Sequence, residues 1–509
     1  MPKYLSVIRS YTTTLPQYII PTIISLLTFG VLARILSARE IGIYGLLVSI
    51  VYLIGLSSNF GLKKTLIVEI SKDRRAWRYT VQATKITLLA IITISIVITS
   101  LLSLFNLFKG VYGEEYIYAG FLMLLILFSI RNYLSFGLEA EKKFHISTLY
   151  TTIGFTIYRV LMLISVILGL SILGIVISWI IGEGITTLAL AKETLKYRSM
   201  WTQNSNLGEI KPILSRAPHV FLSDLTLSLI EYGDRIVTSI FGLYYVANFY
   251  IASTGAQAIA SLAYALYSGL LPHISEEARN NSILEFEEYL QRVSKYAHLF
   301  LSPIYIIASV LAYPLIVIFV GTTYSAAVSQ FQVIVLGLWI TTMLPIINNV
   351  LLATNLTKEL MVIQLLGFLI DIIVMVTLYP YLGYLSAGFG KAFLYVVTLS
   401  LGLVVIWIKL RITPYNFIHL GKTLLANLIS ALIVWITWIL TFRITLIPLY
   451  VFIGMSVYLI LLRLLKIVEY DDIAILQKEI PLKGKIGDII FELIYRLTGI
   501  SPREGKKHE

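Results

Sequence analysis

The chain of 509 residues is 58% apolar and only 13% charged. Soluble domains are about 45–50% apolar and about 25% charged, so this composition excludes an ordinary soluble protein and indicates an integral membrane protein. The net charge of +12 does not indicate a nucleic-acid partner, because the basic residues of membrane proteins gather in cytoplasmic loops. The sequence has no cysteine, which excludes disulfide bonds and thiolate catalysis.

Segments of about 20 mostly apolar residues, the length needed to cross a bilayer, recur along the whole chain. The first, residues 15–37, is longer than the apolar region of a signal peptide and is expected to stay in the protein. The sequence therefore predicts an all-α polytopic membrane protein with about fourteen transmembrane helices. They are expected at residues 15–37, 43–62, 80–107, 116–137, 149–170, 172–191, 218–241, 243–271, 296–320, 330–354, 361–381, 385–408, 421–443 and 446–466.

The basic residues are distributed unevenly between the two sides that these spans define. Of the 40 Lys and Arg residues, six lie within spans, and only three lie in connections on the side opposite the N-terminus, namely Arg39, Lys109 and Arg443. The remainder gather on the side of the N-terminus. Because cytoplasmic loops are enriched in Lys and Arg, this asymmetry predicts a cell-membrane protein with both termini in the cytoplasm.

One long inner connection, residues 192–217, separates six expected helices from eight. After six spans, an even number, the chain is back on the side where it began, so a second six-helix unit would have the same orientation as the first. This predicts two lobes related by an axis along the membrane normal. An amphipathic stretch in the C-terminal tail is expected to lie on the inner membrane surface or to pack on the protein's own loops. We expect an N-terminal lobe at 1–191, a cytoplasmic linker at 192–217, a C-terminal lobe at 218–408, two further helices at 421–466, and a tail with an amphipathic helix at 467–509.

Short motifs in a fixed order carry a resemblance to a known family. They are Leu32 to Ser37, Glu40 to Tyr44, Asn59-Phe60-Gly61-Leu62, Asp234 with Val246 to Ala252, Leu271 to Ser275, Tyr379 to Gly388, and Tyr470-Asp471-Asp472. In these motifs the chain resembles the polysaccharide and oligosaccharide flippases of the multidrug/oligosaccharidyl-lipid/polysaccharide exporter superfamily. The resemblance implies a V-shaped bundle of two six-helix lobes plus two extra C-terminal helices.

The resemblance also implies a function and its partners. It implies alternating-access transport of a polyprenyl- or dolichyl-phosphate-linked glycan through a cavity lined by the first, second, seventh and eighth helices. The partners implied are the lipid-linked glycan, membrane lipids and glycan-assembly proteins, and no enzymatic activity is expected.

Polar side chains at helical spacing support such a cavity from the residues themselves. In the expected helix 243–271 they recur every three or four residues and share one face. Hydroxyls and amides suit a sugar, although Ser and Thr also join helices in membranes, so both interpretations stay open. The residues expected to line the cavity are Tyr250, Thr254, Gln257, Ser261 and Tyr264 on this helix, Asp224, Glu231, Asp234 and Arg235 on the helix before it, and Asn59 on the second helix.

Charged residues within the spans need a partner, a cavity or water, because each costs roughly 2.5–3.5 kcal/mol at the centre of the bilayer. Arg159 and Glu183 stand at similar distances from the turn between their two helices, and Asp371 and Lys391 do the same in a later hairpin. Each pair is expected to form either a salt bridge within its lobe or a coupling site for H⁺ or Na⁺.

Two arginines near the outer helix ends, Arg34 and Arg235, are expected to contact the phosphate of the cargo. Arg binds phosphate oxygens with two parallel hydrogen bonds, and a lipid-linked glycan carries a phosphate next to its lipid. The alternative is that these arginines extend to the membrane interface and bind nothing.

Two further functions stay open beside the glycolipid flippase. A cation-coupled multidrug extruder of the same superfamily would explain the acidic residues of 218–241, but such proteins usually have twelve spans. A membrane-embedded glycosyltransferase would need acidic residues in a sizeable outer loop, whereas Glu114 and Glu115 lie in a short one. The sequence shows no Walker A motif and no metal-ligand cluster, so no cofactor is expected apart from H⁺ or Na⁺ as a coupling ion.

Overall fold

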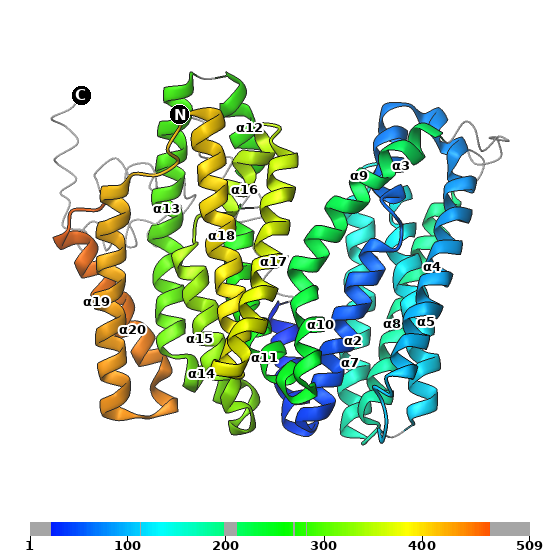
Figure 1. Ribbon diagram of the computed structural model, residues 1–509, viewed down its shortest axis with the longest axis horizontal. Coiled ribbons are helices and arrows are strands. Elements are labelled where there is room, and N and C mark those ends of the chain that lie inside the picture. Colours follow the sequence, from blue (N-terminus) through cyan, green and yellow to red (C-terminus); the bar gives the residue numbers. More distant parts are fainter. Residues whose placement is uncertain (1–21, 112, 198–210, 268–269, 281, 469–509) are drawn as a thin grey trace, which may run out of the picture. The chain divides into compact units, whose positions relative to one another are not determined.

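The computed structural model describes residues 22–111, 113–197, 211–267, 270–280 and 282–468. Within these ranges every regular element is a helix, which confirms the all-α prediction (Figure 1). The start of the first expected span and the expected amphipathic helix of the tail lie outside the described residues.

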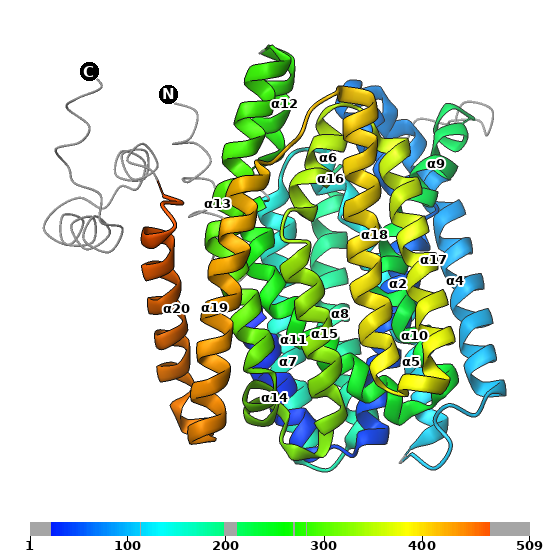
Figure 2. The ribbon, with the colours of Figure 1, turned by 60° about the vertical axis from the view of Figure 1, so that its left-hand side comes forward.

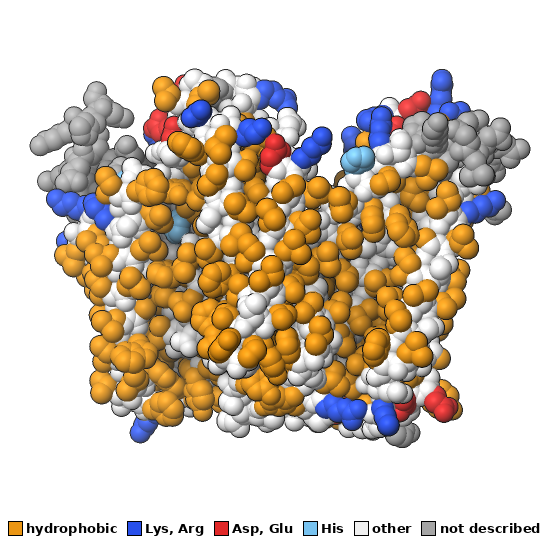
Figure 3. Space-filling model, in the orientation of Figure 1, with side chains coloured by type: hydrophobic (Ala, Val, Ile, Leu, Met, Phe, Trp, Pro, Cys, Tyr) orange, Lys and Arg blue, Asp and Glu red, His pale blue; other side chains and the backbone are white. Residues whose placement is uncertain are grey.

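Eleven helical segments of the described part are long and apolar enough to cross a membrane, and each overlaps an expected span. The other three expected spans fall on the apolar helix Thr22–Ile35, on α9 with α10, and on α11, so the total of fourteen stays a prediction. The visible face of each unit is a band of apolar side chains with charged side chains at its two edges, as expected for helices that cross a bilayer (Figure 3).

The chain divides into two compact units. The N-terminal unit is Leu27–Tyr250, and the C-terminal unit is Met1–Leu26 with Ile251–Glu509. The boundary between them falls within α11 and not in the 192–217 connection, because α9 packs on α2 and α3. The predicted division into lobes at 1–191 and 218–408 stays a prediction.

The N-terminal unit contains five of the long spans, with the hairpin of α7 and α8 as its tightest pair. Its helices are α2 (Ala38–Ser57), α3 (Leu62–Lys72), η1 (Arg74–Tyr79), α4 (Thr80–Leu104), α5 (Glu114–Leu134), α6 (Phe136–Ala140), α7 (Phe144–Ile167), α8 (Ser171–Leu195), α9 (Lys211–Ser228), η3 (Leu229–Gly233), α10 (Asp234–Thr238) and η4 (Ser239–Phe241).

In the C-terminal unit α17 and α18 form a closely packed hairpin, α13 is the most buried span, and α19 and α20 lie side by side at the edge, next to α13 (Figures 1 and 2). Its helices are α11 (Leu243–Tyr267, shared with the other unit), α12 (Leu270–Asn280), α13 (Ile283–Val310), α14 (Ala312–Val320), η5 (Thr322–Tyr324), α15 (Ser325–Ile340), α16 (Leu344–Ala353), α17 (Thr357–Leu382), α18 (Leu385–Leu410), α19 (Phe417–Thr441), η6 (Ile444–Leu446) and α20 (Ile447–Leu464).

In the α7–α8 hairpin and in the α17–α18 hairpin, glycines let the two helices of the hairpin approach each other closely. A Cβ atom on Gly154 of α7 would lie 1.8 Å from Oγ1 of Thr186 on α8, and one on Gly182 would lie 2.7 Å from Cβ of Tyr158. In α17–α18, a Cβ atom on Gly390 would lie 2.4 Å from Oδ1 of Asp371. Small residues at helix contacts let backbones approach closely in membranes, where burial of apolar surface does not drive helices together.

The structure corrects one predicted ion pair. Glu183 contacts Arg131 of α5, with 2.5 Å between Oε2 and Nε, and not Arg159 as the hairpin spacing suggested. The two atoms meet at ion-pair distance without the angle of a hydrogen bond. The prediction was wrong because equal depth in a hairpin fixes only the height of a side chain, whereas the direction around the helix turns Glu183 toward α5.

We therefore expect the free energies of unfolding of Arg131 and Glu183 variants to be coupled. Removing one partner leaves a charge uncompensated inside the unit, so the Arg131→Ala, Glu183→Ala double variant should recover about 1–3 kcal/mol of the summed losses. The measurement is reversible unfolding in detergent micelles. The matched control is the Arg159→Ala, Glu183→Ala cycle, whose losses should add. Coupling in the control cycle but not in the Arg131 cycle would contradict the observed pair.

Candidate functional site

Two glycines of α2 let the first turns of α11 lie against it. A Cβ atom on Gly45 would lie 2.7 Å from Cγ of Tyr250, and one on Gly42 would lie 2.1 Å from the carbonyl oxygen of Leu243. The close approach brings the rings of Tyr44 and Tyr250 edge to face, with centroids 5.7 Å apart and planes at 90°. Such edge-to-face pairs are a favoured arrangement of aromatic rings.

Arg159 of α7 reaches this tyrosine pair from one side. Its Nη1 donates a hydrogen bond to the hydroxyl of Tyr44 over 3.4 Å, and the hydroxyls of Tyr44 and Tyr158 are 3.2 Å apart. The guanidinium lies over the rings of Phe155 and Tyr158, at 4.8 and 5.2 Å from their centroids. In the described part of the chain, no carboxylate lies within ion-pair distance of Arg159.

Arg235 reaches the same pair from another side. It follows a single turn of π-helix, η3, which interrupts the helix between α9 and α10; such turns are frequent at functional sites. Its side chain is only 5% exposed and lies over the rings of Tyr250 and Tyr232, at 5.0 and 5.9 Å. Its Nε makes no hydrogen bond and no ion pair to any residue that the structure describes.

These five side chains, Tyr44, Tyr158, Arg159, Arg235 and Tyr250, form what we call the arginine–tyrosine cluster. An aromatic face stabilises a guanidinium by about 0.5–2 kcal/mol, whereas an intramembrane charge costs roughly 2.5–3.5 kcal/mol or more. Ring contacts alone therefore offset part of that cost. The cluster is a positively charged position that an anion would stabilise.

A series of aromatic rings connects the cluster to the Arg131–Glu183 pair. Trp179 of α8 stacks on Tyr158, with centroids 5.2 Å apart and planes at 17°, and its Nε1 donates to Oε1 of Glu183 over 3.2 Å. Tyr52 stacks on Tyr232, with centroids 5.2 Å apart. The Arg131–Glu183 pair, Arg159 and Arg235 thus lie in the same aromatic interior of the N-terminal unit.

The polar residues predicted to share one face of α11 lie on both sides of the boundary between the units. Tyr250 is buried in the cluster, Thr254 is half-buried, and Gln257 is exposed. The hydroxyl of Ser261 donates to the carbonyl oxygen of Ala258 over 2.6 Å. The side chain of Tyr264 lies outside the described residues. A sugar-binding role for these residues stays a proposal.

Asn59 and Asp224 have partners within the N-terminal unit. The Asn59 side chain accepts a hydrogen bond from the Gly61 N–H over 3.1 Å and donates to the Leu56 carbonyl over 3.1 Å, so it stabilises the turn after α2. Gly61 adopts φ +76° in that turn. Asp224 forms an ion pair with Lys64 of α3. These contacts explain both residues without a bound ligand.

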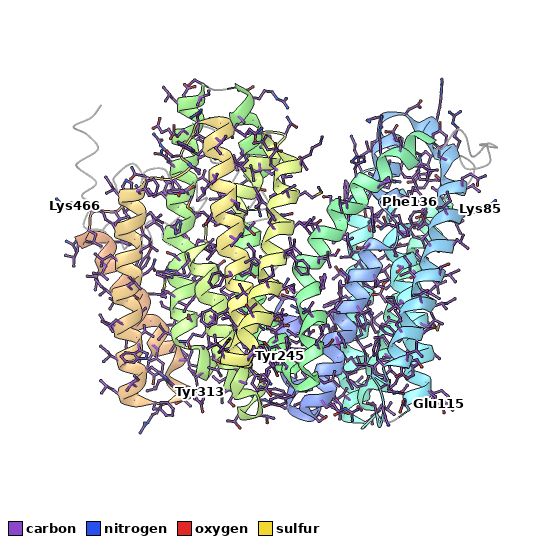
Figure 4. The ribbon with its side chains drawn as sticks, viewed as in Figure 1. Lys85, Glu115, Phe136, Tyr245, Tyr313 and Lys466 are labelled. Atoms are coloured by element: carbon purple, nitrogen blue, oxygen red, sulfur yellow. The ribbon has the colours of Figure 1, made fainter. Side chains whose placement is uncertain are left out.

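The other predicted residues lie in contrasting environments. Arg34 and Glu231 are exposed, and Asp234 is 1% exposed, with its Oδ1 accepting from the Arg235 N–H over 2.7 Å. Asp371 and Lys391 are both buried, on the packed helices α17 and α18. Their expected pairing stays a prediction. Lys85, another charge within an expected span, is exposed on the outer face of α4 and can extend to the interface (Figure 4).

The sequence had indicated no binding role for two members of the cluster, Tyr44 and Tyr158, or for Trp179, which stacks on Tyr158. A signal was present, because Tyr158 directly precedes an arginine in the middle of a span and Tyr44 follows Gly42 in a quoted motif. Among the residues that the structure describes, no three His, Asp or Glu side chains gather as a metal site.

Comparisons with known proteins agree with the expected resemblance. The family described as "Polysaccharide biosynthesis protein" matches residues 31–329. The chain is similar in structure to the lipid II flippase MurJ in an inward closed conformation, with a TM-score of 0.73 and 16% identity over 87% of this chain and 96% of that chain. No curated protein sequence matches the chain.

Two other solved structures are transporters. One is an inward-facing multidrug resistance MATE family transporter of the MOP superfamily, with a TM-score of 0.65 and 15% identity over 77% of this chain and 94% of that chain. The other is a MOP superfamily transporter from Pyrococcus furiosus, described as having a binding pocket of reverse polarity, with a TM-score of 0.54 and 15% identity over 81% and 96%. This chain belongs to the polysaccharide biosynthesis protein family and has the fold shared by the MurJ flippase and the MATE transporters.

Proposed function

We propose that this protein is a flippase that moves a lipid-linked oligosaccharide or polysaccharide repeat unit across the cell membrane by alternating access. The observation that carries the proposal is the arginine–tyrosine cluster, where Arg159 and Arg235 lie inside the unit without a carboxylate partner in the described part. Membership of a polysaccharide biosynthesis family and the flippase fold support it.

The chemistry of the cluster suits the phosphate of a polyprenyl- or dolichyl-phosphate-linked glycan. A guanidinium that rests its face on an aromatic ring keeps its in-plane N–H groups directed sideways, where two of them can bind phosphate oxygens in parallel. The hydroxyls of Tyr44 and Tyr158 add donors beside Arg159. We assign the phosphate contact to Arg235 and Arg159, because Arg34, the expected partner of Arg235, is exposed.

The multidrug extruder is the second candidate, because the chain also shares the fold of MATE transporters. The charge of the cluster disfavours it for cationic drugs, since two guanidinium groups that form no ion pair in the described part of the chain would repel such a cargo. A membrane-embedded glycosyltransferase is disfavoured by the relatives, which are a flippase and transporters.

We further propose that Asp371 and Lys391 form the ion-responsive pair of the C-terminal unit, since both are buried on adjoining helices. A buried carboxylate can exchange a lysine partner for H⁺ or Na⁺ as the helices move. The orientation with both termini in the cytoplasm belongs to the same proposal and rests on the distribution of Lys and Arg.

The phosphate contact predicts graded effects of Arg235 variants on transport. Arg235→Lys keeps a positive charge without the planar fork and should retain partial activity, whereas Arg235→Gln should lower the rate about tenfold or more, because a charge-assisted hydrogen bond is lost. Arg159→Gln should act in the same direction. The measurement is glycolipid translocation in reconstituted vesicles, normalised to inserted protein.

The matched control is Lys85→Gln, which removes an equal charge from the outer face of α4 and should leave the rate unchanged. If the Arg159→Gln, Arg235→Gln double variant transported like the wild type, the phosphate contact would be refuted. Equal losses in all variants, including Lys85→Gln, would point to a general effect of charge on insertion.

The orientation predicts which single cysteines react from which side. The natural sequence has no cysteine, so each introduced one is the only target. Cysteines at Lys142, Lys358 and Gln477 should react only with reagent on the cytoplasmic side, and those at Lys109 and Thr322 only from outside. The test is labelling of intact cells with a membrane-impermeant maleimide. External labelling at Lys358 would overturn the order of spans.

A further inference from the structure

A second polar site lies in the C-terminal unit, where the middle of α13 and the N-terminal end of α19 form a small pocket. Four hydrogen bonds fix the short segment before α19 to α13, and two of them go to the Glu287 carboxylate. The Ser294 hydroxyl donates to the Pro414 carbonyl over 2.7 Å, and Nε2 of Gln291 donates to the Thr413 carbonyl over 3.2 Å. The argument depends on the lining residues Lys295, His298, Asn416, His419 and Thr423.

His298 is buried in this pocket, and one of its ring nitrogens has no hydrogen-bond partner among the described residues. Its side chain is only 4% exposed, and its Nδ1 makes no hydrogen bond within the described ranges. One helical turn further into the membrane, Nδ2 of Asn427 donates to the Ser302 hydroxyl over 2.7 Å, while its Oδ1 is also without a hydrogen bond. Buried polar atoms are nearly always hydrogen-bonded, so an unmet imidazole nitrogen that lines a pocket is open to a ligand or to an ordered water.

The charge of the pocket indicates an anion. Lys295 supplies its positive charge, His298 and His419 add imidazole nitrogens, and no carboxylate is among the lining residues. α19 also begins there: Oδ1 of Asn416 accepts from the N–H groups of Ile418 over 2.9 Å and of His419 over 3.4 Å. These N–H groups are capped by Asn416, but the positive end of the helix dipole still favours an anion, although alone it would not identify a site.

The surroundings indicate that the anion carries acyl chains. Phe417 and Ile418, in the first turn of α19, are 66% and 69% exposed. This helix lies at the edge of the unit beside α20 (Figures 1 and 2). A phosphate in the pocket would therefore have exposed apolar side chains next to it, where hydrocarbon chains can lie.

We propose that this pocket binds the phosphate of an anionic membrane lipid that stays bound to the protein and is not transported. Lys295 supplies the positive charge, His298 supplies the buried hydrogen-bond partner, and the lipid joins α13 to α19. The hydroxyl of Tyr458 on α20 donates to the Leu299 carbonyl over 3.1 Å, so a lipid at this position would strengthen the attachment of both C-terminal helices to α13. The site is separate from the arginine–tyrosine cluster and does not depend on its role.

The test is the thermal stability of the full-length protein in a neutral detergent with short-chain lipids added. Dioctanoyl phosphatidylglycerol should raise the unfolding temperature in a saturable way, because a ligand that binds only the folded state stabilises it. Dioctanoyl phosphatidylcholine and inorganic phosphate should raise it far less. Lys295→Gln should weaken the apparent affinity for phosphatidylglycerol about tenfold, as expected for the loss of a charge-assisted contact.

His298→Leu separates a ligand role from a packing role. Replacing an unmet buried polar group by an apolar one should keep or raise the stability of the lipid-free protein while it weakens lipid binding. Arg292→Gln is the matched control, since Arg292 lies on the same helix, pairs with Glu288 and does not line the pocket; it should bind lipid like the wild type.

Several results would overturn the proposal. Wild-type affinity of Lys295→Gln for phosphatidylglycerol would do so, as would an equal loss in Arg292→Gln. Equal stabilisation by phosphatidylcholine would show that the pocket does not select an anionic headgroup. Equal stabilisation by inorganic phosphate would show that the acyl chains do not contribute to binding. Tighter, Lys295-dependent binding of a polyprenyl monophosphate than of phosphatidylglycerol would assign the pocket to the cargo's own lipid.

Discussion

The electrostatic constraint on which the N-terminal unit depends is that Arg159 and Arg235 lie among its helices without an ion pair in the described part. Arg131 meets Glu183, but Arg159 and Arg235 meet tyrosine rings and a hydroxyl in place of a carboxylate. Aromatic faces stabilise a guanidinium only in part. The arrangement is therefore costly without a ligand and favourable with an anion, which is the behaviour expected of a binding position for a phosphate-bearing cargo.

The backbone is shaped to make that position. Gly42 and Gly45 remove the side chains that would hold α11 away from α2, which lets Tyr250 reach Tyr44. A π-helical turn ahead of Arg235 changes the direction of the side chains that follow it. A helix with such a turn has one weaker stretch in its backbone hydrogen bonding. The same turn that orients Arg235 is thus a natural point for bending when a cargo binds or leaves.

Much of the helical architecture could be predicted from hydropathy, because the length of an apolar span is dictated by the bilayer. The side-chain partners could not. The height of Glu183 in its helix was readable, but its direction depends on which neighbouring helix lies closest, and this selected Arg131. Similarly, the polar spacing on α11 drew attention to Tyr250, which packs against Tyr44 and Arg235, whereas the polar residues Asn59 and Asp224 stabilise a turn and an ion pair.

The central claim is that the cluster recognises phosphate, and the most direct measurement varies the ligand together with the protein. Equilibrium binding of a short-chain polyprenyl-phosphate-linked sugar can be compared with that of the same sugar linked to the lipid without phosphate. In the wild type, loss of the phosphate should weaken binding about tenfold or more, and in the Arg159→Gln, Arg235→Gln variant it should change binding little. Equal sensitivity to the phosphate in both proteins would contradict the account.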